Sequence, residues 1–325
     1  MSDHTFESRL NLSELQNSIT RVREEIGKVI VGQTQMVNLL MTALLADGHV
    51  LLEGVPGVAK TLTAKLLART LAVDFARIQF TPDLMPSDVL GTSVFNLKTS
   101  SFDFKAGPIF SNIVLIDEIN RAPAKTQSAL FEVMEERQVT VDGVTHLMKS
   151  PYLVIATQNP IEHEGTYRLP EAQLDRFLFK ITIDYPDMDQ EVIILKRHHG
   201  RRVMTAVEEV KPVLTADQLA GFRSVSQSVH VEENLLKYIA RIAQETRKNA
   251  MLFLGASPRA SVAMLNAAKA YASLAGRDFV TPEDIKTIAL PALRHRISLN
   301  PDKEMEGVSP DDVVRQVIDR IEIPR

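Results

Sequence analysis

The eight residues Gly54-Val-Pro-Gly-Val-Ala-Lys60-Thr61 constrain the fold of this chain more than any other feature. They fit the phosphate-binding pattern G-x-x-x-x-G-K-[ST] except at Ala59, which replaces the last glycine. An apolar stretch over 49–53 predicts a short buried strand before them, and a helical pattern follows over 62–71. Strand, loop and helix thus occur in the order that surrounds a phosphate with backbone N–H groups. We expect the alanine methyl to be accommodated with a slightly tighter fit.

A second apolar run ends in two carboxylates. Asn112-Ile-Val-Leu-Ile-Asp117-Glu118 is typical of a central parallel strand, whose carboxyl end lies at the same edge as a phosphate loop. There Asp117 would hold Mg²⁺, directly or through water, and Glu118 would accept a proton from the attacking water. An isolated Asp-Glu pair would indicate only exposed acids, but this pair follows Lys60-Thr61 in a chain of alternating strands and helices.

A third apolar run, Tyr152-Leu-Val-Ile-Ala-Thr157, precedes Gln158-Asn159-Pro160. An amide at this point could lie between the phosphate loop and the acids, where it can hold water or contact the γ-phosphate without carrying charge. Asn before Pro is also an ordinary turn former. The position of Asn159 after an adjacent strand favours the role at the site.

These motifs together resemble the AAA+ ATPases, and within them the MoxR family. The resemblance extends from about Leu12 into the final third of the chain. It is carried by the phosphate loop and by Asp117-Glu118-Ile-Asn-Arg121-Ala, Ala156-Thr-Gln-Asn159-Pro and Leu169-Pro-Glu-Ala-Gln-Leu-Asp-Arg176-Phe177. It implies an ATP hydrolase that uses ATP and Mg²⁺.

The resemblance also implies roles for single residues. Lys60 and Thr61 correspond to the Walker A pair, Asp117 and Glu118 to Walker B, and Asn159 to the first sensor. The expected nucleotide-binding residues are Gly54, Val55, Pro56, Gly57, Val58, Ala59, Lys60, Thr61 and Leu62, the expected Mg²⁺ ligands are Thr61 and Asp117, and the expected catalytic residues are Glu118, Asn159, Arg176 and Arg259.

Two arginines are expected to complete the site. Arg176 resembles the arginine finger that enters the neighbouring subunit's site, and Arg259, in Ala256-Ser-Pro-Arg259-Ala, resembles the second sensor on the lid. A guanidinium on developing γ-phosphate charge is worth roughly 10³ to 10⁵ in rate. Each arginine could instead pair with a surface acid or cap a helix, and Arg168 could share the function of the finger.

The order of the elements predicts an α/β fold with a doubly wound, five-stranded parallel sheet. We place this core and its N-terminal helices at 1–186, and an all-α lid at 187–325. The first helix begins at Ser13, with Leu15, Ile19, Val22 and Ile26 on one face. Thr281-Pro-Glu-Asp predicts the start of a lid helix.

Two segments that interrupt the series predict β-hairpins. Ser93-Val-Phe-Asn pairs with Ser101-Phe-Asp-Phe, and Gln138-Val-Thr-Val pairs with Val144-Thr-His-Leu around the turn Asp142-Gly143. The resemblance identifies them as the helix-2 insert and the insert before the first sensor. They either touch a substrate or partner, or pack within a ring.

Composition limits location and partners. The chain has a net charge of −4 and no cysteine, and it shows no signal peptide or membrane-spanning stretch, so we expect a cytoplasmic protein. The basic cluster Lys196-Arg-His-His-Gly-Arg-Arg202 indicates a solvated helix end, or a contact to nucleotide or to a neighbouring subunit. The negative net charge disfavours nucleic acid as the main partner.

The resemblance implies a homo-oligomeric ring, in relatives a hexamer, that remodels or activates a protein client. Such proteins often work with a partner that carries a von Willebrand factor A domain. A metal-chelatase motor subunit is the nearest alternative, because it shares both inserts. A nucleic-acid motor should carry basic residues at the hairpin tips, whereas the second tip here is Val141-Asp142-Gly143-Val144.

Overall fold

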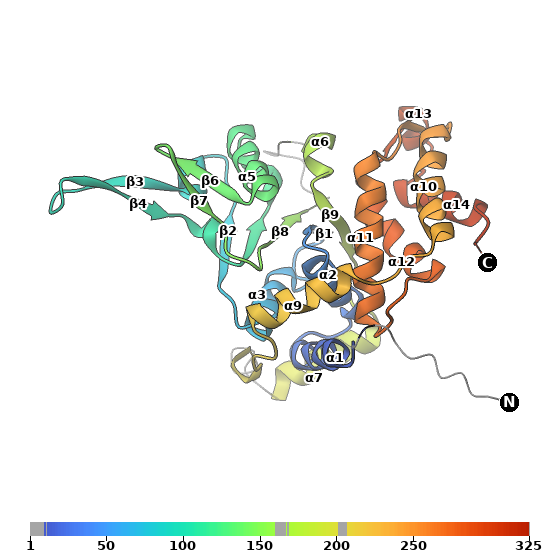
Figure 1. Ribbon diagram of the computed structural model, residues 1–325, viewed down its shortest axis with the longest axis horizontal. Coiled ribbons are helices and arrows are strands. Elements are labelled where there is room, and N and C mark those ends of the chain that lie inside the picture. Colours follow the sequence, from blue (N-terminus) through green and yellow to red (C-terminus); the bar gives the residue numbers. More distant parts are fainter. Residues whose placement is uncertain (1–9, 11, 160–166, 168, 201–206, 325) are drawn as a thin grey trace.

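The computed structural model of the protein describes residues 10, 12–159, 167, 169–200 and 207–324 (Figure 1). Its centre is a parallel sheet of five strands in the order β2-β5-β8-β1-β9, which confirms the predicted sheet. The strands are β1 (His49–Gly54), β2 (Phe75–Gln79), β5 (Ile113–Asp117), β8 (Leu153–Gln158) and β9 (Phe177–Ile183).

The central strands are apolar throughout because the sheet is buried on both faces. Val50 and Leu52 of β1 belong to one hydrophobic cluster, whereas Leu51 between them belongs to a second cluster on the opposite face. The flanking helices of this part are α1 (Ser13–Gly27), α2 (Thr34–Leu45), α3 (Lys60–Thr70), α4 (Pro86–Leu90), α5 (Ala124–Glu136) and α6 (Glu171–Leu174). The apolar face predicted for α1 is buried as expected.

Strand register gives the sheet two distinct edges. Gly54 at the end of β1 lies beside Ile183 at the end of β9, while His49 lies beside Phe177 at the opposite ends. We call these the carboxyl edge and the amino edge. Asp117 ends β5 at the carboxyl edge, where it pairs with Gln79 of β2.

Both predicted hairpins are present. They are formed by β3 (Gly91–Asn96) with β4 (Ser101–Ala106), and by β6 (Gln138–Val141) with β7 (Val144–Leu147). The turn residues Asp142 and Gly143 have φ of 50° and 78°, the left-handed conformation of a tight hairpin turn.

The two hairpins are joined by side chains. Ser93 of β3 donates a hydrogen bond to Asp142 at the tip of the second hairpin. Phe104 of β4 stacks on His146 of β7 with ring centroids 4.2 Å apart. The ribbon β3–β4 projects far from the body of the molecule, with β6–β7 along its base (Figure 1).

The C-terminal part is mainly helical. Its helices are α7 (Met188–Gly200), α9 (Ala216–Gln227), α10 (Glu233–Lys248), α11 (Pro258–Leu274), α12 (Pro282–Leu293), α13 (Pro301–Met305) and α14 (Pro310–Arg320). Helix α12 starts where predicted, with the Thr281 hydroxyl accepting from the backbone N–H of Asp284. Strands β10 (Leu252–Leu254) and β11 (Ser298–Leu299) form a short antiparallel pair that the sequence analysis did not foresee, so the lid region also contains a small sheet.

Residues just after the predicted boundary at 186/187 pack on the N-terminal helices. Arg197 of α7 donates to the carbonyl of Gly27 at 2.9 Å, and Arg223 of α9 donates to the carbonyl of Leu44 at 2.6 Å. Helices α7 and α9 therefore cover the α/β core, and the body of the lid is built from α10 to α14 (Figure 1).

Candidate functional site

The 54–61 loop joins β1 to α3 at the carboxyl edge. A Cβ on Gly54 would lie 2.7 Å from the carbonyl oxygen of Ile183, so close packing on β9 requires glycine here. Gly57 has φ of 88°, and a Cβ there would meet no heavy atom within 4 Å. The middle of the loop is thus left-handed and open to the surroundings, as the cradle for a phosphate must be.

Ala59 differs from the motif in its effect on the backbone. It has φ of 61° and ψ of 22°, a left-handed conformation that costs an L-residue about 1–2 kcal/mol. The cost of having alanine here therefore lies in the strained backbone of residue 59. The sequence had led us to expect a tighter fit of the methyl group instead.

Lys60 and Thr61 open helix α3. The Lys60 ammonium donates to the carbonyl oxygen of Gly54 at 2.6 Å, so the side chain folds back across the loop. The first N–H groups of a helix have no partner within the helix and favour an anion. The loop, the lysine and the helix start together suit a phosphate group.

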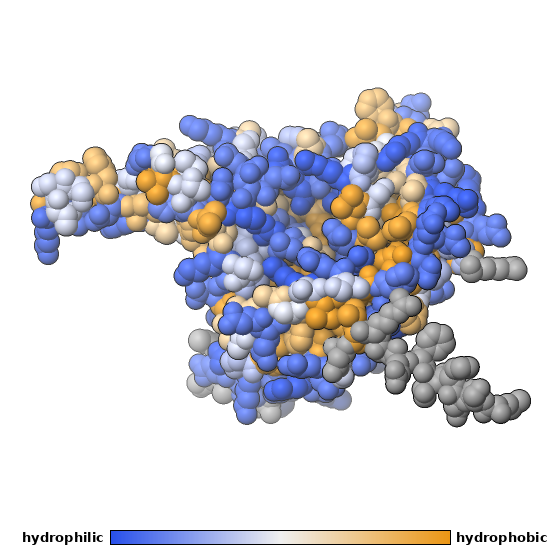
Figure 2. Space-filling model, viewed as in Figure 1, coloured by the Kyte–Doolittle hydropathy of each residue, from blue (hydrophilic) through white to orange (hydrophobic). Residues whose placement is uncertain are grey.

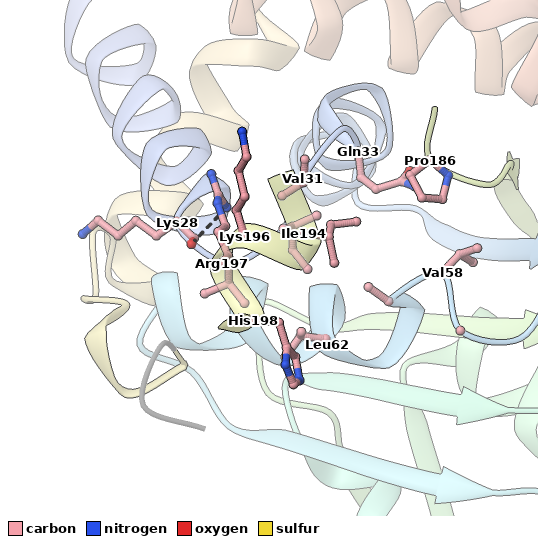
Figure 3. A pocket seen from close by; sticks show the side chains of 14 residues that line it. Lys28, Val31, Gln33, Val58, Leu62, Pro186, Ile194, Lys196, Arg197 and His198 are labelled. Atoms are coloured by element: carbon pink, nitrogen blue, oxygen red, sulfur yellow. Dashed lines mark hydrogen bonds between the residues drawn. The ribbon is translucent and has the colours of Figure 1, made fainter. Parts of the chain in front are cut away.

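A cavity of about 650 Å³ lies beside this loop (Figure 3). It is enclosed by the α1–α2 connection, by the loop and the start of α3, and by α7, and its lining includes Val29, Ile30, Val31, Val58, Leu62 and Ile194. This mixture of apolar walls and a phosphate cradle suits a nucleotide, whose base needs an apolar slot.

The basic cluster of α7 contributes to that cavity. Lys196, Arg197 and His198 line it, which is compatible with the contact to nucleotide that the sequence left open. Arg197 also donates to the carbonyls of Gly27 and Lys28, at 2.9 and 3.1 Å, and thereby holds α7 against the end of α1. Arg201 and Arg202 lie outside the described residues.

Asp117 is a buried carboxylate with two side-chain partners. One oxygen accepts from Nε of Arg77 at 2.6 Å, and the other accepts from the Thr157 hydroxyl at 3.1 Å. A buried charge requires such partners. Thr157 also accepts from the backbone N–H of Glu118 at 3.0 Å, and thus connects both acids to β8.

Glu118 directly follows β5 with φ of 57°. Its Oε2 accepts from Gln79 Nε2 at 2.8 Å and lies 3.0 Å from Nε of Arg121. Sequence reasoning missed Gln79 and Arg77 as parts of the site. Their alternation along β2 puts them on one face of the strand, but only the pairing of β2 with β5 shows that this face meets the acids.

Asn159 lies directly after β8 and is 9% exposed. Strand β8 is placed between β5, which carries the acids, and β1, which carries the loop. The predicted location of Asn159 between the loop and the acids is therefore compatible with the sheet order.

Arg176 lies at the amino edge, immediately before β9. Its Nη1 donates to the carbonyl of Phe131 at 3.2 Å and to Glu135 Oε2 of α5 at 2.9 Å. Strand β1 separates this edge from the phosphate loop by roughly 17–20 Å, since a strand rises about 3.3 Å per residue. Arg176 therefore does not reach the loop of its own chain.

Arg259 joins Arg176 at the amino edge. Its Nη2 lies 3.5 Å from Glu135 Oε1, and the neighbouring Ser257 donates to Asp175 at 3.1 Å. In the single chain each arginine pairs with a surface acid, one of the alternatives left open by the sequence. Arg168, the other candidate for the finger, lies outside the described residues.

A buried ion pair fixes the lid at this edge. Arg296 Nε donates to Asp175 Oδ1 at 2.6 Å, and its Nη atoms donate to the carbonyls of Phe177 and Leu178. The Arg296 side chain is 4% exposed, and this burial lowers the pKa of the guanidinium. The lid and the segment before β9 are thus held as one unit.

Comparison with known proteins decides the family. Residues 49–179 match the model of the ATPase family associated with various cellular activities (AAA), and residues 244–317 match the AAA lid domain. The chain is 43% identical to the chaperone MoxR1 of Mycobacterium tuberculosis over 95% of this chain and 83% of that protein. The chain belongs to the MoxR family of AAA+ ATPases.

Other relatives of this MoxR-family chain agree. It is 46% identical to YeaC, an uncharacterised protein of Bacillus subtilis, over 96% of both chains. The crystal structure of a proposed ATPase from Cytophaga hutchinsonii superposes with a TM-score of 0.88 at 42% identity, covering 96% of this chain and 97% of that one. The α/β core with its helical lid is thus the fold of the family.

Among the described residues of the MoxR-family chain, no group of three or more His, Cys, Asp or Glu side chains could hold a metal ion, so the Mg²⁺ ligands predicted at Thr61 and Asp117 would need phosphate oxygens and water to complete the shell. No described helix has the length and hydrophobicity needed to cross a bilayer.

Proposed function

We propose that this chain is a Mg²⁺-dependent ATPase whose active sites are shared between neighbouring copies in a ring, of hexameric form as the family suggests. One observation carries the proposal. The phosphate loop and the acids lie at the carboxyl edge of the sheet, whereas Arg176 and Arg259 lie together at the amino edge. A complete site therefore needs the carboxyl edge of one copy and the amino edge of the next.

The residues of the carboxyl edge would divide the work. Lys60 and the N–H groups of the loop bind phosphates, and Glu118 takes the proton of the attacking water. Thr61 and Asp117 would hold Mg²⁺, which neutralises charge on the phosphates when bound. Asn159 orients the water or contacts the γ-phosphate without adding charge.

We further propose that the ring remodels a protein client, as the name of the chaperone MoxR1 suggests for that relative. The projecting hairpin is the surface best suited to a client. It exposes Phe95, Leu97 and Phe102 by 48%, 86% and 70%, and Figure 2 shows apolar residues among polar ones along the projecting arm. Exposed apolar side chains on one arm mark an interaction site.

A cytoplasmic location and a von Willebrand factor A domain partner complete this proposal.

The role of the projecting hairpin is tested by its deletion. Deletion of residues 94–105 should abolish client binding and client-stimulated turnover while the basal turnover persists. Unchanged binding and stimulation would contradict the role of the hairpin.

A nucleic-acid motor is disfavoured because Asp142 occupies the tip of the second hairpin and is bonded to Ser93. A chelatase-type motor subunit would share the ring and the inserts. Stimulation of ATP turnover by a candidate protein partner, but not by DNA, is the expected result, and the reverse result would favour the nucleic-acid motor.

The shared site is tested by measuring ATP turnover per chain against protein concentration, with mass determination on the same samples. Turnover per chain should rise as rings form. Turnover that is independent of concentration in a monomeric sample would contradict the proposal.

A further inference from the structure

Glu135 is the meeting point of the two arginines at the amino edge. It lies in the last turn of α5, where Oε2 accepts from Arg176 at 2.9 Å and Oε1 lies 3.5 Å from Nη2 of Arg259. The arginines come from different parts of the chain, one before β9 and one on the lid helix α11. A single carboxylate therefore sets the distance between a core arginine and a lid arginine.

Electrostatics explains why a carboxylate is needed there. Two guanidinium groups side by side repel each other, and a negative charge between them offsets that repulsion. The group is partly solvated, since the side chains of Glu135, Arg176 and Arg259 are 39%, 29% and 63% exposed. Exposed ion pairs contribute little to stability, so this carboxylate can orient the two arginines without adding much to the stability of the fold.

The geometry leaves Arg176 able to bind a further anion. Among the described residues, its hydrogen bonds to Phe131 and Glu135 are both made by Nη1. Arginine presents five N–H donors in a rigid fork, so anchoring one nitrogen orients the rest of the fork. Such pre-orientation is what a group that stabilises a transition state requires.

We infer that Glu135 is a positioning residue of the shared site, which holds Arg176 and Arg259 side by side for the γ-phosphate bound by the neighbouring copy. This inference rests on the proposed function. Glu135 itself does not touch the nucleotide and acts through the two arginines. Its partners are partly exposed and belong to separate elements, so its role is to orient them, while the lid is fixed by the buried pair of Arg296 and Asp175.

The test compares Glu135→Gln with Glu136→Gln in assembled protein. Glu136 is the next residue, is exposed, and makes no ion pair among the described residues, so it provides the same charge change without the arginines. Glu135→Gln should lower kcat roughly ten- to hundredfold through misplaced arginines. Its KM for ATP should stay within about twofold of wild type, because the carboxyl edge is untouched, and kcat is compared between samples whose mass shows the same assembly. The kcat of Glu135→Asp should lie between the kcat values of Glu135→Gln and Glu136→Gln.

A double variant separates positioning from a general structural effect. In an Arg176→Ala background, Glu135→Gln should cause much less loss than it does alone, because its main partner is already absent. Fully additive losses, or equal kcat for Glu135→Gln and Glu136→Gln, would overturn the inference. If wild-type turnover per chain does not rise with assembly, the proposed shared site itself fails and the inference fails with it.

Discussion

The expected catalytic residues lie at two edges of the central sheet, and the two groups differ in how their own chain holds them. At the carboxyl edge the acids are held by their own chain, through Arg77, Gln79 and Thr157. At the amino edge Arg176 and Arg259 share an exposed carboxylate and reach no phosphate site of their own chain. Under the proposed function, the difference teaches that one copy would bind nucleotide but would contain only half of a hydrolytic site.

The largest effect is expected at the amino edge. Arg176→Ala should lower turnover in assembled protein by about 10³-fold or more, because the guanidinium would stabilise charge on the γ-phosphate. ATP affinity, measured by titration with a fluorescent analogue, should change little since the loop is intact. A weaker affinity for ATP with an unchanged kcat would contradict this division of roles between the two edges.

At the carboxyl edge Glu118→Gln should lower turnover by roughly 10² to 10⁴, because the amide cannot accept the proton of water. The variant should bind ATP and assemble like wild type, as followed by mass determination with ATP. Activity within a few-fold of wild type would remove Glu118 as the base. Because Gln79 already bonds Glu118 in the structure, the substituted amide can remain in place.

The buried anchor of the amino edge should matter for stability. Arg296→Met leaves the carboxylate of Asp175 without its cation at a largely buried position, and should lower the free energy of unfolding by about 3–5 kcal/mol in urea titration. Arg315→Met is the control, since that side chain is 60% exposed and its ion pairs with Asp311 and Asp312 should contribute little. Equal effects would show that the lid is not held by the buried pair.

Acid should destabilise the fold through His49, at the start of β1. Its Nδ1 accepts from the N–H of Val154 while its Nε2 donates to the carbonyl of Met134, an arrangement that requires a neutral ring. Burial lowers its pKa from 6.5 to about 3, and burial lowers the pKa of His295 as well. The unfolded chain therefore takes up protons below pH 6.5 that the folded chain does not accept.

The His49 contribution is complete above pH 6.5 and should fall by about 2 kcal/mol between pH 6.5 and pH 5, with a further loss of the same sign from His295. Urea unfolding at a series of pH values measures this loss. A free energy of unfolding that is constant over this range would contradict the account of His49 as a neutral ring buried at the start of β1.

The smallest effect concerns the phosphate loop. Ala59→Gly should raise the free energy of unfolding by less than about 1 kcal/mol, because relief of the left-handed strain is partly offset by glycine entropy. Ala72, with φ of 49° at the end of α3, is the matched control outside the site. Similar stabilisation by Ala72→Gly in urea titration would show that the gain comes from relief of the left-handed backbone strain. Stabilisation by Ala72→Gly alone would show that Ala59 is not strained.

Much of the fold could be predicted from the sequence because its signals are local. The apolar runs gave β1, β5 and β8, the turn Asp142-Gly143 gave a hairpin, and Ser13 and Thr281 marked helix starts. The short pair β10–β11 was missed because two- and three-residue strands that meet across a long stretch of sequence carry no periodic signal.

The motifs of the candidate site could be predicted from the sequence, but the side chains that hold its acids and arginines in place could not. Arg77, Gln79 and Glu135 act through neighbours that are distant in sequence, so only the strand order and the packing of α5 reveal them. The sequence likewise named Arg259, but could not place it beside Arg176 at the edge away from the phosphate loop. The roles of these residues in catalysis stay predictions.

The shared site is tested most directly by mixing two inactive variants. Glu118→Gln chains retain both arginines, and Arg176→Ala chains retain the loop and the base. Mixed in equal amounts and allowed to reassemble, they should regain up to about a quarter of wild-type turnover, since about one contact in four then joins an intact carboxyl edge to an intact amino edge. A mixture that assembles but stays as inactive as its parts would contradict a site built from two copies.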